Sequence, residues 1–83
     1  MKFKTAKDTL YAVDLKGIAV SSHGSINTFI NYPEAAVWLV LVQNHPEEKT
    51  LKMLASILGK DEINTGKFIN KCLQSWREAS MIE

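Results

Sequence analysis

The sequence has one cysteine and two prolines, and neither sign of charge predominates. Because Cys72 cannot form an internal disulfide, we expect a reducing compartment and take a cytoplasmic protein as the default. Ten basic and nine acidic residues give a formal charge of +1, whereas a dedicated nucleic-acid-binding domain is more often strongly basic. The longest apolar run, Ala35 to Val42, has eight residues, far fewer than the ~20 that span a bilayer. The basic N-terminus is not followed by an apolar core, so no signal peptide is expected.

Residues arranged for catalysis or metal binding are also missing. Cys72 lies within an apolar helical stripe, where cysteine is usually a small buried hydrophobe. His23 and His45 lie in turns and have no partner at zinc-ligand spacing. No glycine-rich loop precedes a helix, so a phosphate site is not indicated. We therefore expect a protein that is not an enzyme and that uses no metal or cofactor.

The composition is that of an ordinary globular domain. Hydrophobic residues make up 46% of the chain and charged residues 23%. A chain of 83 residues forms one domain with a modest core, so we expect a single domain over residues 1–83. Residues 1–8 are mostly polar and are expected to be a solvated, flexible lead-in.

Three short segments in the N-terminal half are rich in β-forming residues. They are Thr9 to Val13, Ile18 to Ser21 and Ile26 to Ile30. Turn-forming residues separate them at Asp14 to Gly17 and at Ser22 to Ser25. Connections this short predict an antiparallel meander, in which the third strand is an edge.

Alternation assigns the third strand two faces. Ile26, Thr28 and Ile30 are expected on one face, and Asn27 and Phe29 on the other.

The apolar run from Ala35 to Val42 is expected to be a helix rather than a buried strand. Asn31 can cap it, Pro33 suits a first turn, and Glu34 favours the positive helix end. The residue before a proline resists the α region, so Tyr32 is the alternative cap. A helix that is apolar on all sides must be covered on more than one side. We therefore expect it between the sheet and the later helices.

Two further helices follow. Pro46 opens the first, and Gly59 is a natural C-terminal stop. Residues 60–64 are expected to be a polar connector, and the last helix is expected from about Thr65 to Ala79. Its apolar stripe consists of Phe68, Ile69, Cys72, Leu73 and Trp76. Met81 and Ile82 are expected to return to the core. The fold class is thus α+β, with a three-stranded antiparallel sheet followed by three helices.

The junction between strand and helix resembles that of PqqD-like proteins, also called RiPP recognition elements, which are small winged-helix domains. Ile30-Asn31 matches the start of their Leu-Asn-Glu-like triplet, Ala35-Ala36 their small pair, and Val37-Trp38 their aliphatic-Trp pair. The tail, residues 79–82, is similar to their Gly-Leu-Ile-like end. The resemblance covers nearly the whole chain in element order.

The sequence departs from the family pattern at three positions. Tyr32 stands where an acidic residue is usual, Pro33 is atypical, and Ser80 replaces a glycine. These departures bear on the identity of the partner more than on the fold.

The resemblance implies that the domain captures the leader segment of a precursor peptide and presents it to a modifying enzyme, often a radical SAM protein. The residues agree with this mechanism, because an open edge strand can pair with an extended peptide. The expected peptide-binding residues are the edge strand and one face of the last helix: Ile26, Asn27, Thr28, Phe29, Ile30, Lys67, Asn70, Lys71 and Gln74. This helix face carries three basic residues, Lys67, Lys71 and Arg77, and one acidic residue, Glu78. We therefore hypothesise a leader with acidic residues.

Two other function classes remain open. A DNA-binding winged helix would use Lys67, Asn70, Lys71 and Arg77 of the last helix for phosphate and base contacts. Near-neutral net charge and the absence of a wing after that helix weigh against it. An assembly adaptor would instead dock on an enzyme without touching a peptide. The open edge also permits a homodimer.

Overall fold

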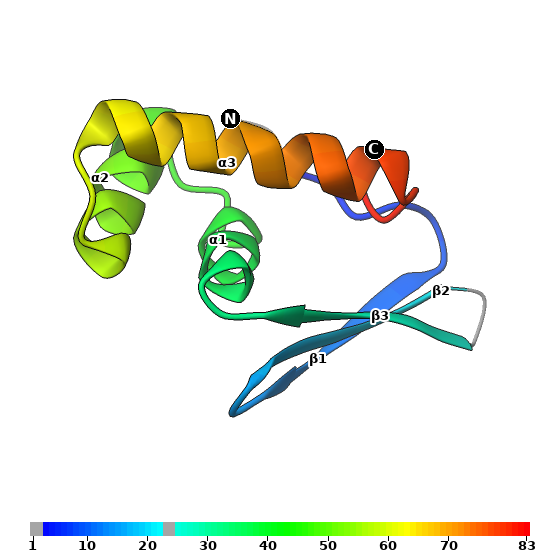
Figure 1. The fold of residues 1–83 in the computed structure, drawn as a ribbon. Helices are drawn as coiled ribbons and strands as arrows, with labels where there is room; N and C mark the ends of the chain where they lie inside the picture. Colours follow the sequence, from blue (N-terminus) through cyan, green and yellow to red (C-terminus); the bar gives the residue numbers. More distant parts are fainter. Residues whose placement is uncertain (1–2, 23–24) are drawn as a thin grey trace.

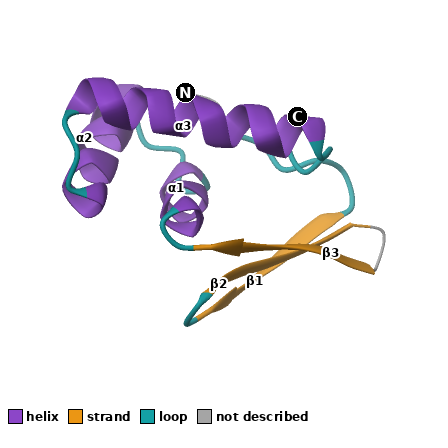
Figure 2. Ribbon diagram, in the orientation of Figure 1, coloured by secondary structure: helices purple, strands orange, loops and turns teal. Residues whose placement is uncertain are grey.

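The N-terminal half of the chain forms a sheet and the C-terminal half forms helices, which confirms the predicted α+β order (Figure 1). The computed structural model describes residues 3–22 and 25–83. The elements are β1 (Thr9–Asp14), β2 (Gly17–Ser22), β3 (Ser25–Asn31), α1 (Glu34–Leu41), α2 (Glu47–Leu58) and α3 (Glu62–Glu78). The sheet order is β1-β2-β3 with antiparallel pairs, so β1 and β3 are its edges within the described residues. Figure 2 shows the strands and the helices in separate layers.

The β1–β2 hairpin confirms the first predicted turn. Asp14 pairs with Gly17 across a loop of Leu15 and Lys16, and the Asp14 carboxylate accepts a hydrogen bond from the Lys16 backbone N–H at 3.1 Å. A Cβ atom on Gly17 would collide with the backbone carbonyl of Ile30 on β3. This position therefore requires glycine, because two neighbouring strands approach it closely.

The pairing of β2 with β3 contains a bulge. Val20 pairs with Thr28 but Ser21 pairs with Ile26, so Asn27 is an extra residue on β3. Beyond the bulge the predicted alternation is confirmed, since Ile30 is buried and Phe29 on the opposite face is 42% exposed. The bulge interrupts strict alternation between Ile26 and Thr28, and the side chains of Ile26 and Asn27 lie outside the described part of the structure. The predicted turn at Ser22 to Ser25 likewise falls partly on residues outside it.

Helix α1 occupies the centre of the core, as its all-apolar sequence predicts. Val37 and Trp38 are completely buried, and α1 packs against β3, α2 and α3. Figure 1 shows α1 between the sheet and α3. The predicted cap is wrong, because Asn31 is held in β3 by pairing with Gly17. Pro33 is the N-cap residue instead, without a side-chain hydrogen bond.

An aromatic cluster joins the sheet, the helices and the N-terminal segment. The Trp38 ring meets Trp76 at 5.1 Å, Phe3 at 5.2 Å and Tyr11 at 5.7 Å between centroids, each edge to face. Phe3 is only 7% exposed, and the Ala6 N–H donates to the Met81 carbonyl at 3.0 Å. These contacts differ from the expected solvated lead-in over residues 1–8, because an aromatic side chain ties this segment to the core.

The connection from α2 to α3 is shorter than predicted. Gly59 ends α2 in the left-handed conformation with φ 65°, as expected. Asp61 then caps α3, because its carboxylate accepts the Asn64 backbone N–H at 2.7 Å. The predicted connector over residues 60–64 and the start at Thr65 are therefore wrong by one helical turn. Lys60 stands between the two caps, and its N–H donates to the Ala55 carbonyl at 3.1 Å.

Candidate functional site: a groove between β3 and α3

A groove separates the open edge of β3 from the C-terminal half of α3. We call it the edge groove, and its lining comes from β3, the start of α1, α3 and the chain end: Thr28, Phe29, Ile30, Asn31, Glu34, Ser75, Trp76, Ala79 and Met81. Two stretches far apart in the sequence, residues 28–34 and 75–81, thus surround one space. Among the described residues the strand supplies one unpaired edge, and α3 supplies a wall facing it.

Small side chains on α3 leave the edge groove open. Ser75 and Ala79 are one helical turn apart, so they lie on the same face of α3. Trp76 and Met81 also line the groove, but each is only 5% exposed. Only a small part of each side chain therefore reaches the groove surface. The α3 wall therefore leaves space beside β3 at Ser75 and Ala79, and the base of the groove is apolar.

The end of α3 explains why Met81 reaches this position. Ser80 adopts φ 61°, its N–H donates to the Arg77 carbonyl, and the Met81 N–H donates to the Trp76 carbonyl at 2.9 Å. This is the Schellman pattern, which normally brings an apolar residue after the helix against its last turn. The predicted return of Met81 and Ile82 to the core is confirmed, since both are buried.

The backbone of β3 has hydrogen-bonding capacity toward the groove. In an antiparallel pair, alternate residues direct their N–H and C=O groups to the partner strand, and the residues between them direct theirs outward. Among the described residues β3 pairs only with β2. Half of its backbone groups therefore face the open edge, beside Ser75 and Ala79.

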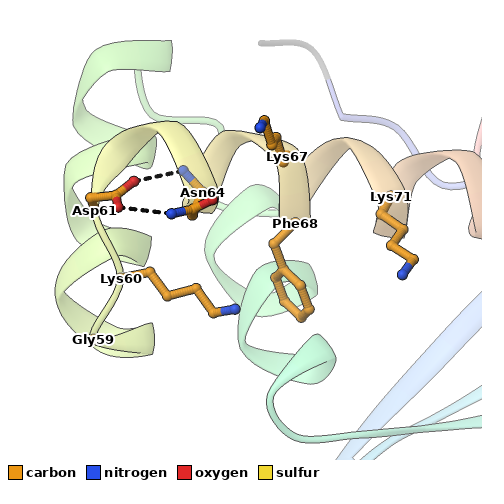
Figure 3. A pocket seen from close by; sticks show the side chains of 7 residues that line it. All are labelled: Gly59, Lys60, Asp61, Asn64, Lys67, Phe68 and Lys71. Carbon is orange, nitrogen blue, oxygen red and sulfur yellow. Dashed lines mark hydrogen bonds between the residues drawn. The ribbon is translucent and has the colours of Figure 1, made fainter.

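The groove continues toward the N-terminal half of α3. A middle hollow shares Glu34, Ser75 and Trp76 with the edge groove and is also lined by Phe68, Lys71 and Cys72. A third hollow, which we call the basic hollow, shares Phe68 and Lys71 with the middle one (Figure 3). Its lining residues are Gly59, Lys60, Asp61, Asn64, Lys67, Phe68 and Lys71. Together the three form one track along α3.

The structure brings part of the predicted site together. Thr28, Phe29 and Ile30 line the edge groove, and Lys67 and Lys71 line the basic hollow. The backbones of Ile26 and Asn27 belong to β3 at the bulge.

The other two predicted helix residues lie elsewhere. Asn70 and Gln74 are exposed and are not among the residues that line the track. At 3.6 residues per turn, they stand about 100–140° from Ser75 around the helix axis. Arg77, which the acidic-leader hypothesis includes, is also outside the track.

Sequence reasoning missed the residues that shape the groove. Glu34, Ser75, Ala79 and Met81 line it, yet none belongs to the predicted peptide-binding set. One feature of the sequence could have indicated Ser75 and Ala79. They are small residues at i, i+4 spacing, so they lie on one helix face and leave space beside it. The approach of α3 to β3 has no local signal, because it depends on how α1 spaces the two layers.

The charges along the track are unequal. Glu34 lies at the junction of the edge groove and the middle hollow, whereas lysines line the far end. The Lys60 ammonium lies 5.1 Å from the centre of the Phe68 ring, a cation–π arrangement. Hydrogen bonds from Asn64 hold the pKa of Asp61 below its usual range. The track is thus acidic at one point and basic at its end.

Cys72, at the floor of the middle hollow, is not arranged as a nucleophile. Burial raises the pKa of its thiol to about 11, with a smaller contribution from the Glu34 charge. Within residues 3–22 and 25–83, no group of three His, Cys, Asp or Glu side chains is placed to hold a metal ion. The same part of the chain has no helix with the length and apolar character to cross a membrane.

Comparison with known proteins adds no further assignment. A scan against protein-family models, a search of curated proteins and a search of solved structures each found no match to this chain.

Proposed function

We propose that this protein is a non-catalytic peptide-binding domain that takes an extended peptide as a fourth strand beside β3. The observation that carries the proposal is the edge groove, in which an open strand edge faces a helix wall made shallow by Ser75 and Ala79. Strand addition uses backbone hydrogen bonds for affinity and side-chain pockets beside the edge for specificity. Both parts are present in one groove.

The groove indicates the kind of peptide that fits. A strand added to β3 directs alternate side chains to opposite faces of the sheet. One set would contact Trp76 and Met81 at the base of the groove, and the other would lie near Phe29 on the exposed face. We therefore expect an extended segment with apolar residues at every second position.

The resemblance to PqqD-like proteins supports a more specific form of the proposal. In that form the peptide is the leader segment of a precursor peptide, and the domain presents it to a modifying enzyme such as a radical SAM protein. The compartment would be the cytoplasm, where the single thiol of Cys72 stays reduced.

Selection from a random-peptide display library, followed by synthesis of an enriched peptide, tests the proposal. N-methylation of single peptide amides removes one donor at a time. Strand addition predicts that methylation at every second residue weakens binding about tenfold, whereas methylation between them has little effect, because only alternate amides face β3. Weakening without a period of two, or no saturable binding by any enriched peptide, would overturn the proposal.

A substitution in the wall tests the location. Ser75→Trp places a large ring in the edge groove and is expected to abolish binding of the same peptide. Gln74→Trp is the matched control, because it adds the same ring one residue away on an exposed part of α3 outside the groove. Equal binding to both variants would place the peptide elsewhere on the molecule.

A further inference from the structure

The edge groove accounts for only part of the track along α3. The middle hollow and the basic hollow continue from the Asn31 end of the edge groove, past Glu34, to Lys60. Trp76, shared by the first two spaces, and Phe68, shared by the last two, are eight residues apart on α3. At 1.5 Å per residue this separation is about 12 Å, which about four extended peptide residues span.

The basic hollow contains more positive than negative charge. Lys60, Lys67 and Lys71 line it together with one carboxylate, Asp61. That carboxylate is engaged, because one of its oxygens accepts the Asn64 backbone N–H and the other accepts the Asn64 side-chain amide at 2.8 Å. Asp61 still attracts the Lys60 charge, but three ammonium groups and one carboxylate leave the lining with an excess of positive charge.

The backbone fixes the point from which the Lys60 side chain extends into this hollow. Lys60 follows the αL residue that ends α2 and precedes the residue that caps α3, so both of its neighbours are constrained. Its ammonium is further placed by the Phe68 ring. Figure 3 shows Lys60 and Lys71 on either side of that ring, with Lys67 directed away from it. The Lys60 ammonium thus lies against the ring, and Lys71 lines the same hollow.

We propose that the basic hollow binds an acidic segment of the same peptide, located on the N-terminal side of the residues that pair with β3. The inference rests on the proposed function and adds to it a second subsite and the N-to-C direction of the bound peptide. An antiparallel guest strand, the slightly more stable arrangement per residue, begins at the Asn31 end of β3. Residues that precede it in the peptide therefore continue along the track toward Lys60.

Glu34 refines the expected sequence. It lies midway, where it would repel a peptide carboxylate. The acidic residues are therefore expected about four positions before the paired segment, with neutral or basic residues between.

Three synthetic peptides test the inference. Each carries the same display-selected strand segment, preceded by an acidic block, followed by an acidic block, or preceded by a block of the corresponding amides. The leading acidic block is expected to bind about tenfold tighter than its amide form at low salt, a gain that largely disappears at about 0.5 M salt. The trailing block is expected to give no gain.

Paired variants locate the effect. Lys60→Gln with Lys71→Gln is expected to remove the gain from the leading acidic block and to change binding of the amide peptide much less. Lys49→Gln with Arg77→Gln is the matched control, since it removes the same charge from exposed residues outside the track. An equal loss in both double variants would show a general charge effect and overturn the inference.

The remaining outcomes separate this inference from the proposed function. If all three peptides bind equally and Ser75→Trp still blocks them, the peptide-binding function stands and the acidic subsite is wrong. If none binds, both are wrong. A random DNA duplex that binds at low salt and depends on Lys60 and Lys71 would assign the basic hollow to phosphate, and so would also overturn the inference.

Discussion

In the part of the chain that the structure describes, both edges of the sheet are open, yet they differ in what lies beside them. On β1, Leu10 is 72% exposed and Val13 is 58% exposed, so apolar side chains on both faces of the strand meet solvent. On β3, Ile30 is 5% exposed and the backbone runs beside the wall of α3. An unpaired edge offers hydrogen bonds to any extended chain. The wall beside β3 adds shape, apolar contact and charge, which in the proposed function make β3 the specific peptide-binding edge.

The difference depends on Trp38, which touches both sides of the molecule. It contacts Tyr11 on β1 and Trp76 on the groove side, and its side chain is completely buried. Trp38→Ala is expected to cost about 3–5 kcal/mol of unfolding free energy, enough to unfold a marginally stable small domain. Urea denaturation measures the loss.

A milder variant keeps this prediction testable. Trp38→Phe retains an aromatic ring and removes an indole Nε1 that has no hydrogen-bond partner in the described structure, so a smaller loss is expected. Leu15→Ala is the control, because Leu15 is 97% exposed. If Trp38→Ala were as stable as this control, the aromatic cluster would not be the core.

The reactivity of the Cys72 thiol tests the environment on the groove side of the molecule, because Cys72 lines the middle hollow. Because the pKa of Cys72 is raised from 9.0 to about 11, its thiolate fraction near pH 8 is about 100-fold below that of an ordinary thiol. Alkylation of the folded protein should be slower than that of the urea-unfolded chain by about this factor. Equal rates in both states would show that the middle hollow is open to solvent.

The same shift has a consequence for stability. The thiol is easier to deprotonate in the unfolded state, so the unfolded chain binds fewer protons above pH 9.0. Stability should therefore decrease as pH rises from 9.0 toward about 11. Cys72→Ala should remove this part of the pH dependence, although its lower starting stability must be measured as well.

Side-chain truncation compares the two edges directly. Phe29 lines the edge groove and is 42% exposed, so Phe29→Ala is expected to weaken a display-selected peptide about fivefold. Leu10→Ala removes an apolar side chain from β1 that is more exposed, at 72%, and is expected to leave affinity unchanged. Titration calorimetry measures both. The reverse order would assign the peptide to β1.

The smallest expected effect concerns the end of α3. Ser80 adopts a left-handed φ of 61°, where glycine has no steric cost. Ser80→Gly is expected to raise stability by about 0.5–1 kcal/mol, whereas Ala79→Gly, at the right-handed cap, should lower it. Thermal denaturation compares them. A loss of stability with Ser80→Gly would argue against the Schellman ending.

The sequence predicted the order of strands and helices because each element carries its own period. Residues 35–42 are apolar without interruption, and the stripe over Phe68 to Trp76 recurs at helical spacing. These patterns state which face is buried, and the structure buries those faces.

Other features depend on partners distant in sequence. Asn31 has the properties of a cap, but pairing with Gly17 keeps it in β3. Phe3 lies among polar residues in the sequence, and only the folded structure brings it against Trp38 and Trp76. The predicted edge strand is correct, but the groove depends on the approach of α3, which no local pattern specifies. By contrast, the Asp61 cap was readable from the sequence.

Amide hydrogen exchange, with and without a display-selected peptide, tests the central claim most directly. Binding beside β3 predicts added protection at alternate amides of residues 28–31, whose groups face the edge groove, and no change along β1. Added protection on β1, or protection on neither edge at saturating peptide, would contradict the account.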